Sequence, residues 1–171
     1  MSDIKIFISS SFYSRSLVNL FMESIKNKYS DCIFYTPSWL DSKKDVIDDF
    51  YTCVQRDIAE LEESDFVITF VPWGVGSKCE TCYTLGLRKP ILILADKLML
   101  DSLKRVDYSD YSDLYPLALF KYVEEADDRI ISSIIDDISN FRICVTDIKL
   151  FQKFLDELIC YVRRKKEQTS I

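Results

Sequence analysis

The stretch "DFVITFVPWGVGSKCETCYTLGLRKPILILA", residues 65–95, decides the fold. Its apolar run Asp65–Val71 predicts a buried strand, which Pro72 ends. A short helix is predicted over Glu80–Leu87, and a second buried strand over Pro90–Ala95. Two strands that are apolar on both faces, with a helix between them, are typical of a parallel sheet covered by helices on both sides.

The rest of the chain continues this alternation of strands and helices. Further strands are predicted over Ile4–Ile8, Cys32–Thr36 and Leu117–Val123. Helices are predicted over 16–29, 46–62, 125–141 and 147–165, and a polar, tyrosine-rich loop or flap over 101–116. We therefore expect a single-domain, Rossmann-like (flavodoxin-like) α/β fold with a parallel sheet of about five strands and an extra C-terminal amphipathic helix.

The length of 171 residues fits one domain with a sizeable core. We expect residues 1–140 to form the α/β domain. The C-terminal helical extension, residues 141–171, is expected to pack on the same domain or at a dimer interface. The chain has no apolar run long enough to span a bilayer and no signal peptide at its start, so we expect a cytoplasmic protein that does not bind membranes.

The charge and residue counts exclude several classes of function. A formal net charge of −6 disfavours a nucleic-acid polymer as partner, and the basic run Arg163–Lys166 falls at the end of a predicted helix, where cations favour the helix dipole. The chain has no histidine, which excludes Ser-His-Asp and Cys-His catalysis and Cys2His2 zinc sites. Cys79 and Cys82 form a lone CxxC, for which a thioredoxin-like role is an open alternative. We expect no metal and no cofactor.

The carboxyl ends of the first and third predicted strands carry polar residues that would meet at one edge of the sheet. Ser9, Ser10 and Ser11 follow the first strand, where hydroxyls and free N–H groups suit an anion or a ribose, or simply cap the next helix. After the third strand, Gly74 and Gly76 would let the backbone approach a ligand.

Glu80 stands at the same edge and has two interpretations. Ser77 and Glu80 have the S-x-x-E spacing of a capping box, which would place Glu80 in the first helical turn with a structural role. Alternatively, with no histidine present, this carboxylate is a candidate for catalysis.

Three ordered blocks resemble the nucleoside 2-deoxyribosyltransferase family, which includes 2′-deoxynucleoside 5′-monophosphate N-glycosidases. "GSKCETCYTLGLRKPILIL" is similar to the family signature G-[ST]-x-x-E-x-G-Y-A-x-A-x-G-K-P, matched at Gly76, Ser77, Glu80, Tyr83, Lys89 and Pro90. "QRDIAELEESDFVITFV" resembles an upstream segment, with Asp57 and Asp65 at its acids, and "KIFISSSF" resembles the opening strand and turn. The resemblance covers about residues 4–135.

This resemblance implies specific roles for individual residues. Glu80 would attack or stabilise the anomeric carbon as the N-glycosidic bond breaks, because the transition state resembles an oxocarbenium ion. Asp57 would position the nucleophile and the sugar. The hydroxyls of Ser9, Ser10, Ser11 and Ser77 would hold the 5′ end of the substrate, and Arg15 could add positive charge there.

The chain also departs from the family pattern. Phe7 stands where many members have a tyrosine that hydrogen-bonds the catalytic acid, and Cys82 and Arg88 replace glycines. The acid often found just before the glycine loop is missing, and Pro72 and Trp73 stand there. Trp73 could stack on a base or a nicotinamide ring, and we expect Phe7 to line the substrate site as well.

Two other interpretations remain open. "IKIFISSSFYSRSLVNLF" and "GSKCE" also resemble a TIR domain, which would make Glu80 the residue that cleaves NAD. A nucleotide-binding sensor without turnover is the third possibility. The expected partners are a small nucleoside, nucleotide or NAD and a second copy of the chain, for which the C-terminal helix is a candidate surface.

Overall fold

A computed structural model describes residues 3–11, 15–36, 50–71, 73–103, 119–135, 138 and 141–169. Six strands form a single sheet in the order β2-β1-β3-β4-β6-β5, and every pair is parallel. They are β1 (Ile4–Ser9), β2 (Cys32–Tyr35), β3 (Phe66–Val71), β4 (Ile91–Ala95), β5 (Lys121–Tyr122) and β6 (Arg142–Val145). The expected parallel α/β fold is confirmed, with one strand more than predicted.

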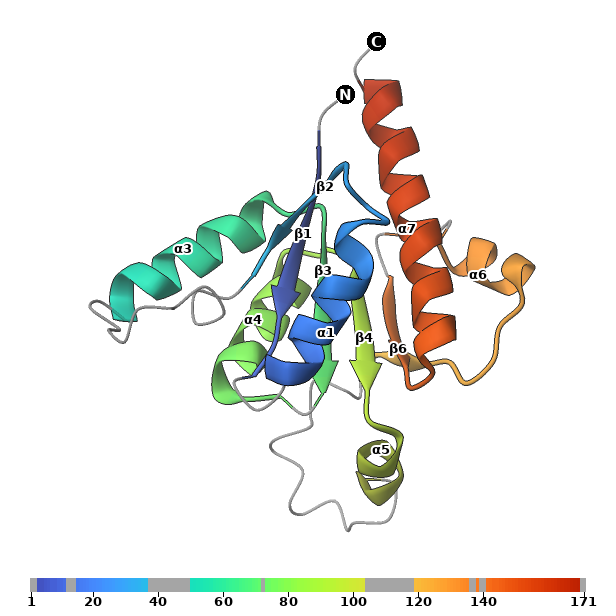
Figure 1. The fold of residues 1–171 in the computed structure, drawn as a ribbon, viewed down its shortest axis with the longest axis horizontal. Helices are drawn as coiled ribbons and strands as arrows, with labels where there is room; N and C mark the ends of the chain where they lie inside the picture. The colour runs from blue at the N-terminus through green and yellow to red at the C-terminus, as the bar shows by residue number, and fades with distance from the viewer. Residues whose placement is uncertain are drawn as a thin grey trace.

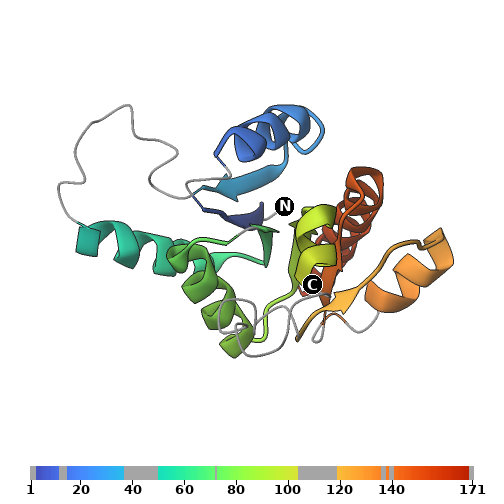
Figure 2. The same ribbon diagram turned by 90° about the horizontal axis from the view of Figure 1, so that it is seen from below.

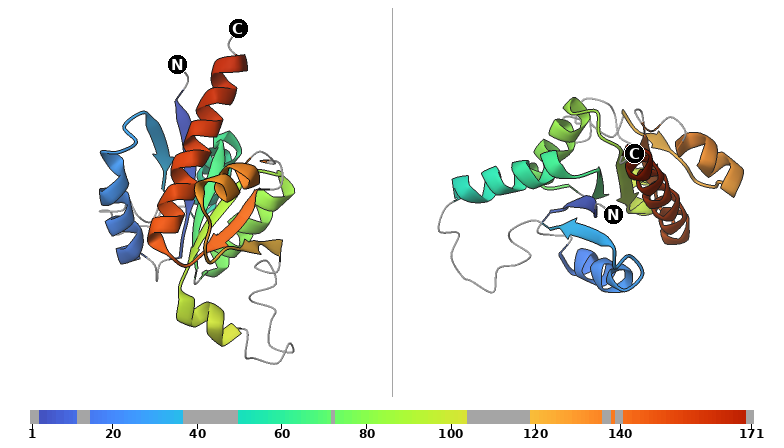
Figure 3. Two further views of the ribbon diagram at one scale, coloured as in Figure 1. Left: turned by 90° about the vertical axis from the view of Figure 1, so that its right-hand side faces the viewer. Right: turned by 90° about the horizontal axis from the view of Figure 1, so that it is seen from above.

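Helices cover both faces of the sheet. They are α1 (Arg15–Lys26), α3 (Phe50–Glu63), α4 (Val75–Gly86), α5 (Lys97–Leu103), α6 (Asp128–Ile135) and α7 (Ile148–Thr169). Seen from below, α1 and α4 lie on opposite sides of the strands, and α3 lies beside α4 (Figure 2). The side view of Figure 3 shows the same three layers. None of the helices in the described ranges has the combination of length and apolar character needed to cross a membrane.

The alternation of side chains along each strand builds two separate cores. On β1, Ile4, Ile6 and Ile8 face the larger core, to which α1, α6 and α7 contribute. Phe7 points to the opposite face and belongs to a smaller core with Leu61 of α3. Because both faces are buried, the strands read as continuous apolar runs in the sequence.

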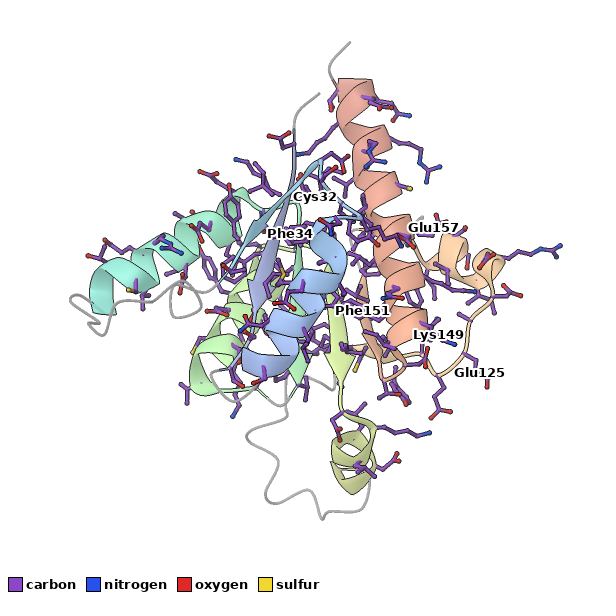
Figure 4. The ribbon with its side chains drawn as sticks, in the orientation of Figure 1. Cys32, Phe34, Glu125, Lys149, Phe151 and Glu157 are labelled. Carbon is purple, nitrogen blue, oxygen red and sulfur yellow. The ribbon has the colours of Figure 1, made fainter. Side chains whose placement is uncertain are left out.

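The C-terminal helix α7 is part of the main core. Its apolar stripe (Leu150, Phe151, Phe154, Leu155, Leu158, Ile159 and Val162) is buried. Phe151 is fully buried and meets Phe21 of α1 edge to face, with ring centroids 5.5 Å apart. In Figure 4, Phe151 lies on the inner side of α7, whereas Lys149 and Glu157 lie on its outer side. The stripe is therefore used inside the chain and is not available to a second copy.

The structure corrects several predicted boundaries. The strand β6 was not predicted; it lies between β4 and β5, inside the segment assigned to the C-terminal extension. Its four residues give too short an apolar run to stand out between two helical patterns. Of the predicted strand 117–123 the structure describes 119–123, where β5 lies; of the predicted helix 125–141 it shows α6, and residues 136, 137, 139 and 140 lie outside the described part. The start of the predicted helix 46–62 and most of the loop or flap 101–116 lie outside the described residues.

The basic run near the C-terminus takes part in ion pairs within the chain. Arg163 pairs with Asp31, and Lys166 pairs with Asp65 at 2.7 Å. Lys166 and Arg163 thereby tie the end of α7 to the amino-terminal edge of the sheet, where both chain termini lie (Figure 1). A structural use for these two cations is consistent with the expectation that this run does not bind nucleic acid.

Candidate functional site

The candidate site lies where the sheet order reverses, at the carboxyl ends of β1 and β3. From β1 the chain proceeds outward to β2, and from β3 it proceeds in the other direction to β4. Parallel α/β sheets bind ligands at such a switch point. The ends of β1, β3 and β4 point downward in Figure 1, and the first turn of α4 lies at that edge.

The start of α4 shows that Glu80 is not a capping residue. The helix begins at Val75 with Gly74 as its N-cap, five residues before the predicted start. Ser77 is therefore the third helical residue, and its hydroxyl accepts a hydrogen bond from the Gly74 N–H at 2.9 Å. Glu80 follows in the second turn. The prediction that Ser77 and Glu80 form a capping box is wrong, because Ser77 itself closes the helix start against Gly74.

The carboxylate of Glu80 points instead to the end of β1. The Ser9 hydroxyl donates a hydrogen bond of 2.6 Å to Glu80 Oε2, across 71 positions of the sequence. Ser9 is fully buried and Glu80 is partly buried. The sequence analysis predicted that the Ser9 hydroxyl holds the 5′ end of a substrate. Its role as the partner of Glu80 was missed, although Ser9 follows Phe7 on the α4 face of β1 by simple alternation.

The surroundings of Glu80 raise the pKa of its carboxyl group into the neutral range. The net effect raises the pKa of Glu80 to about 7: burial raises it most, the Ser9 hydrogen bond lowers it, and the negative charge of Asp57 on α3 raises it. The loss of hydration penalises the charged form more strongly than one hydroxyl can offset. Asp57 on α3 is thus near enough to Glu80 on α4 for its charge to act on the carboxylate.

Small side chains hold α4 against the sheet and so fix the position of Glu80. Ser77, Thr81 and Thr84 form the buried face of α4. Thr81 and Thr84 donate hydrogen bonds of 2.7 Å to the carbonyls of Ser77 and Glu80, which satisfies hydroxyls that the packing removes from water.

The two loops of the site also approach each other closely. A Cβ on Gly74 would lie 3.1 Å from the Cβ of Ser11, a tight contact that would require one of the two loops to shift by a few tenths of an ångström. A Cβ on Gly76 would meet nothing within 4 Å. The approach of a ligand to these two glycines stays a prediction; at Gly74 the close contact with Ser11 also favours a small residue.

The other predicted binding residues differ in what the structure shows of them. Ser10 is 4% exposed, and within the described part of the chain its hydroxyl has no hydrogen-bond partner. A bound ligand can supply the hydrogen bond that this buried hydroxyl lacks. Arg15 opens α1, but its side chain is outside the described part of the structure.

Trp73 and Phe7 contribute packing. The indole N–H of Trp73 donates a hydrogen bond of 2.8 Å to the Thr69 hydroxyl, and its ring packs against the smaller core. Phe7 is fully buried in that core. Contact of either side chain with a substrate stays a prediction, which the complete burial of Phe7 does not favour. Phe7 has no hydroxyl to offer Glu80, and Ser9 provides a hydrogen bond instead.

The remaining candidate groups are the two thiols of the CxxC motif. Cys79 and Cys82 are exposed free thiols on α4. Within the described ranges, no group of three or more Cys, Asp and Glu side chains is arranged to hold a metal ion.

Comparison of the chain with models of known protein families gave no match, and comparison with curated proteins gave none either. The assignment of function therefore rests on the residues of the site and on the sequence blocks described above.

The raised pKa of Glu80 predicts a pH-dependent stability gain for Glu80→Gln. The folded state binds a proton that the unfolded state releases above pH 4.5, so the wild type loses stability as the pH rises from about 4.5 to 7. The glutamine variant has no such proton to lose. Its unfolding free energy, relative to the wild type, should increase over this range by about 1–3 kcal/mol and then level off.

Urea unfolding at several pH values measures this difference. Glu124→Gln, at an exposed acid, controls for the loss of one surface charge. A gap between Glu80→Gln and the wild type that stays constant from pH 4.5 to 8 would contradict the shifted pKa.

Proposed function

We propose that the chain cleaves the N-glycosidic bond of a nucleoside or nucleotide, with Glu80 as the residue that attacks or stabilises the anomeric carbon. The acceptor of the sugar is water or a second base. The proposed setting is the cytoplasm, and the chemistry requires no metal.

The observation that carries this proposal is the placement of Glu80. Its carboxylate is at the switch point of the sheet, is held by Ser9 at 2.6 Å, and has no capping role in α4. Keeping an acid there has a cost, because burial and Asp57 both oppose its ionisation. A buried acid with a strongly perturbed pKa at a ligand-binding edge is typical of a functional group.

The chemistry suits a carboxylate with a second acid nearby. As the C1′–N bond breaks, its electron pair leaves with the base, and positive charge develops on the sugar ring. The anionic form of Glu80 stabilises that charge or bonds to C1′, and the negative charge of Asp57 adds to the field. Water or another base then completes the exchange at C1′.

One backbone angle supports the alignment with the deoxyribosyltransferase signature. Arg88 stands where the signature has glycine, and its φ of 56° lies in the left-handed region that favours glycine. Among the described residues Arg88 is the one non-glycine residue with a positive φ. A left-handed backbone at this position would therefore explain why the signature has glycine there.

The expected result of a product assay is release of a free base from a deoxynucleoside or its 5′-monophosphate. Chromatography of reactions with deoxynucleosides, their monophosphates and NAD separates the candidates. Glu80→Gln should lower turnover at least about a hundredfold, the usual cost of removing a group that stabilises transition-state charge. Glu124→Gln should leave it unchanged.

Other products would select the alternatives. Nicotinamide release from NAD that depends on Glu80 would assign the chain to the TIR-like class. Absence of turnover, with a nucleotide that still raises the melting temperature, would favour the sensor without catalysis and contradict the proposal.

Substitutions of Ser9 and Asp57, the two neighbours of Glu80, should shift the pH dependence of activity in opposite directions. Activity that needs the carboxylate form rises with pH through the pKa of Glu80, about 7. Ser9→Ala removes the hydrogen bond that lowers this pKa, so the acidic limb should shift to higher pH. Asp57→Asn removes a like charge, so the limb should shift to lower pH.

The measurement is the pH dependence of kcat for both variants beside the wild type. Losses of activity without a shift of the acidic limb would contradict the role given to Ser9 and Asp57, since damage to the fold alone lowers the rate at every pH.

A further inference from the structure

Two residues on the α4 side hold the carboxyl end of α3. The Tyr83 hydroxyl of α4 donates a hydrogen bond to the Glu62 carboxylate of α3. The Lys89 ammonium, which follows α4, donates hydrogen bonds to the backbone carbonyl of Glu62 at 2.6 Å and to that of Ser64. Carbonyls at the end of a helix lack partners within it and carry the negative end of the helix dipole, so a cation is favourable there. We call Tyr83 and Lys89 the α3 clamp.

The turn that ends α4 fixes the position of Lys89. The Lys89 N–H donates a hydrogen bond of 3.3 Å to the Thr84 carbonyl, and the Arg88 N–H donates one of 3.1 Å to the Leu85 carbonyl. Together with the left-handed backbone of Arg88, these two bonds form a Schellman motif. Lys89 is partly buried, and burial lowers its pKa. A cation in such a place needs hydrogen-bond acceptors, and the end of α3 supplies two.

α3 has few buried side chains of its own. Among its described residues Leu61 is the buried one, and in Figure 1 the start of α3 projects to the left, away from the strands. Asp57 precedes Leu61 by one turn and so lies on the same side of α3. The charge of Asp57 acts on Glu80 of α4. Since like charges repel, this pair pushes α3 away from α4, and the α3 clamp opposes that movement.

We propose that Tyr83 and Lys89 are positioning residues, which hold α3 against α4 and thereby keep Asp57 beside Glu80. Both side chains bind α3, so their effect on Glu80 passes through the position of Asp57. The importance of the clamp for catalysis rests on the proposed function. The arrangement of the two acids, however, can be measured without turnover.

A carbon-13 NMR titration of the Glu80 carboxyl tests the clamp. The variants are Tyr83→Phe, which removes one exposed hydroxyl, Lys89→Met, which removes the ammonium, and the two combined. When α3 moves away, Glu80 loses its like-charged neighbour, so the midpoint of the combined variant should fall by about half a pH unit or more. Loss of a cation alone would raise the pKa of a carboxyl group, so a fall does not come from the missing charge of Lys89. Lys89→Arg keeps donors for the carbonyls and should restore the wild-type midpoint.

Matched control variants lie on α7, which packs on the opposite face of the sheet from Leu61 of α3. Tyr161→Phe removes a tyrosine hydroxyl there, and Lys149→Met removes an exposed ammonium on the outer side of α7 (Figure 4). Both should leave the Glu80 midpoint unchanged. Melting temperatures show whether each variant is folded at the pH values of the titration.

Repeating the titration in an Asp57→Asn background separates positioning from a general loosening of the fold. The clamp substitutions should move the Glu80 midpoint much less there, because the charge through which they act is gone. An equal fall in both backgrounds would overturn the proposal, since the clamp would then only shield Glu80 from water. A midpoint that stays constant or rises in the folded combined variant would overturn it as well.

Activity assays keep this proposal separate from the proposed function. If the chain releases a base, the acidic limb of kcat in the clamp variants should shift with the Glu80 midpoint. If no substrate is cleaved but the midpoint falls as expected, the proposed N-glycosidic cleavage is contradicted and the role of Tyr83 and Lys89 in placing Asp57 is supported.

Discussion

The hydrogen bond from Ser9 to Glu80 connects the end of β1 to the second turn of α4, and the arrangement of the site depends on it. It forms because three conditions are met together. The end of β1 must lie beside that of β3, α4 must begin at Gly74, and the small residues Ser77, Thr81 and Thr84 must bring the helix onto the sheet. A bulkier residue on this face of α4 would move the helix outward and carry Glu80 away from Ser9.

The same geometry explains why Glu80 is electrostatically unfavourable where it stands. The fold buries the Glu80 carboxylate and places the negative charge of Asp57 nearby. In compensation the carboxylate accepts one short hydrogen bond, from Ser9. A glutamine of the same size would suit the fold better at neutral pH. Electrostatically unfavourable groups of this kind are usually found at functional sites, where they lower stability but provide reactivity. The proposed cleavage of an N-glycosidic bond uses both acids and gives this unfavourable pair a function.

The sequence predicted the parallel α/β fold because β1, β3 and β4 are buried on both faces and so appear as unbroken apolar runs. It also placed Glu80 and the serines Ser9, Ser10 and Ser11 at one edge of the sheet. It missed β6, whose four residues are held by pairing with β4 and β5 and not by a distinctive local pattern. It misplaced the start of α4 because the spacing of Ser77 and Glu80 imitates a capping box, whereas Gly74 is the N-cap. The contact of Ser9 with Glu80 spans 71 positions; alternation along β1 places Ser9 on the α4 face, but no local pattern identifies its partner.

The most direct measurement is a carbon-13 NMR titration of the Glu80 side-chain carboxyl in the wild-type protein, assigned by comparison with Glu80→Gln. The structure predicts a midpoint near 7, because burial and Asp57 outweigh the hydrogen bond from Ser9. A midpoint near the ordinary glutamate value of 4.5 would mean that the carboxylate is well hydrated, and would contradict the proposed site.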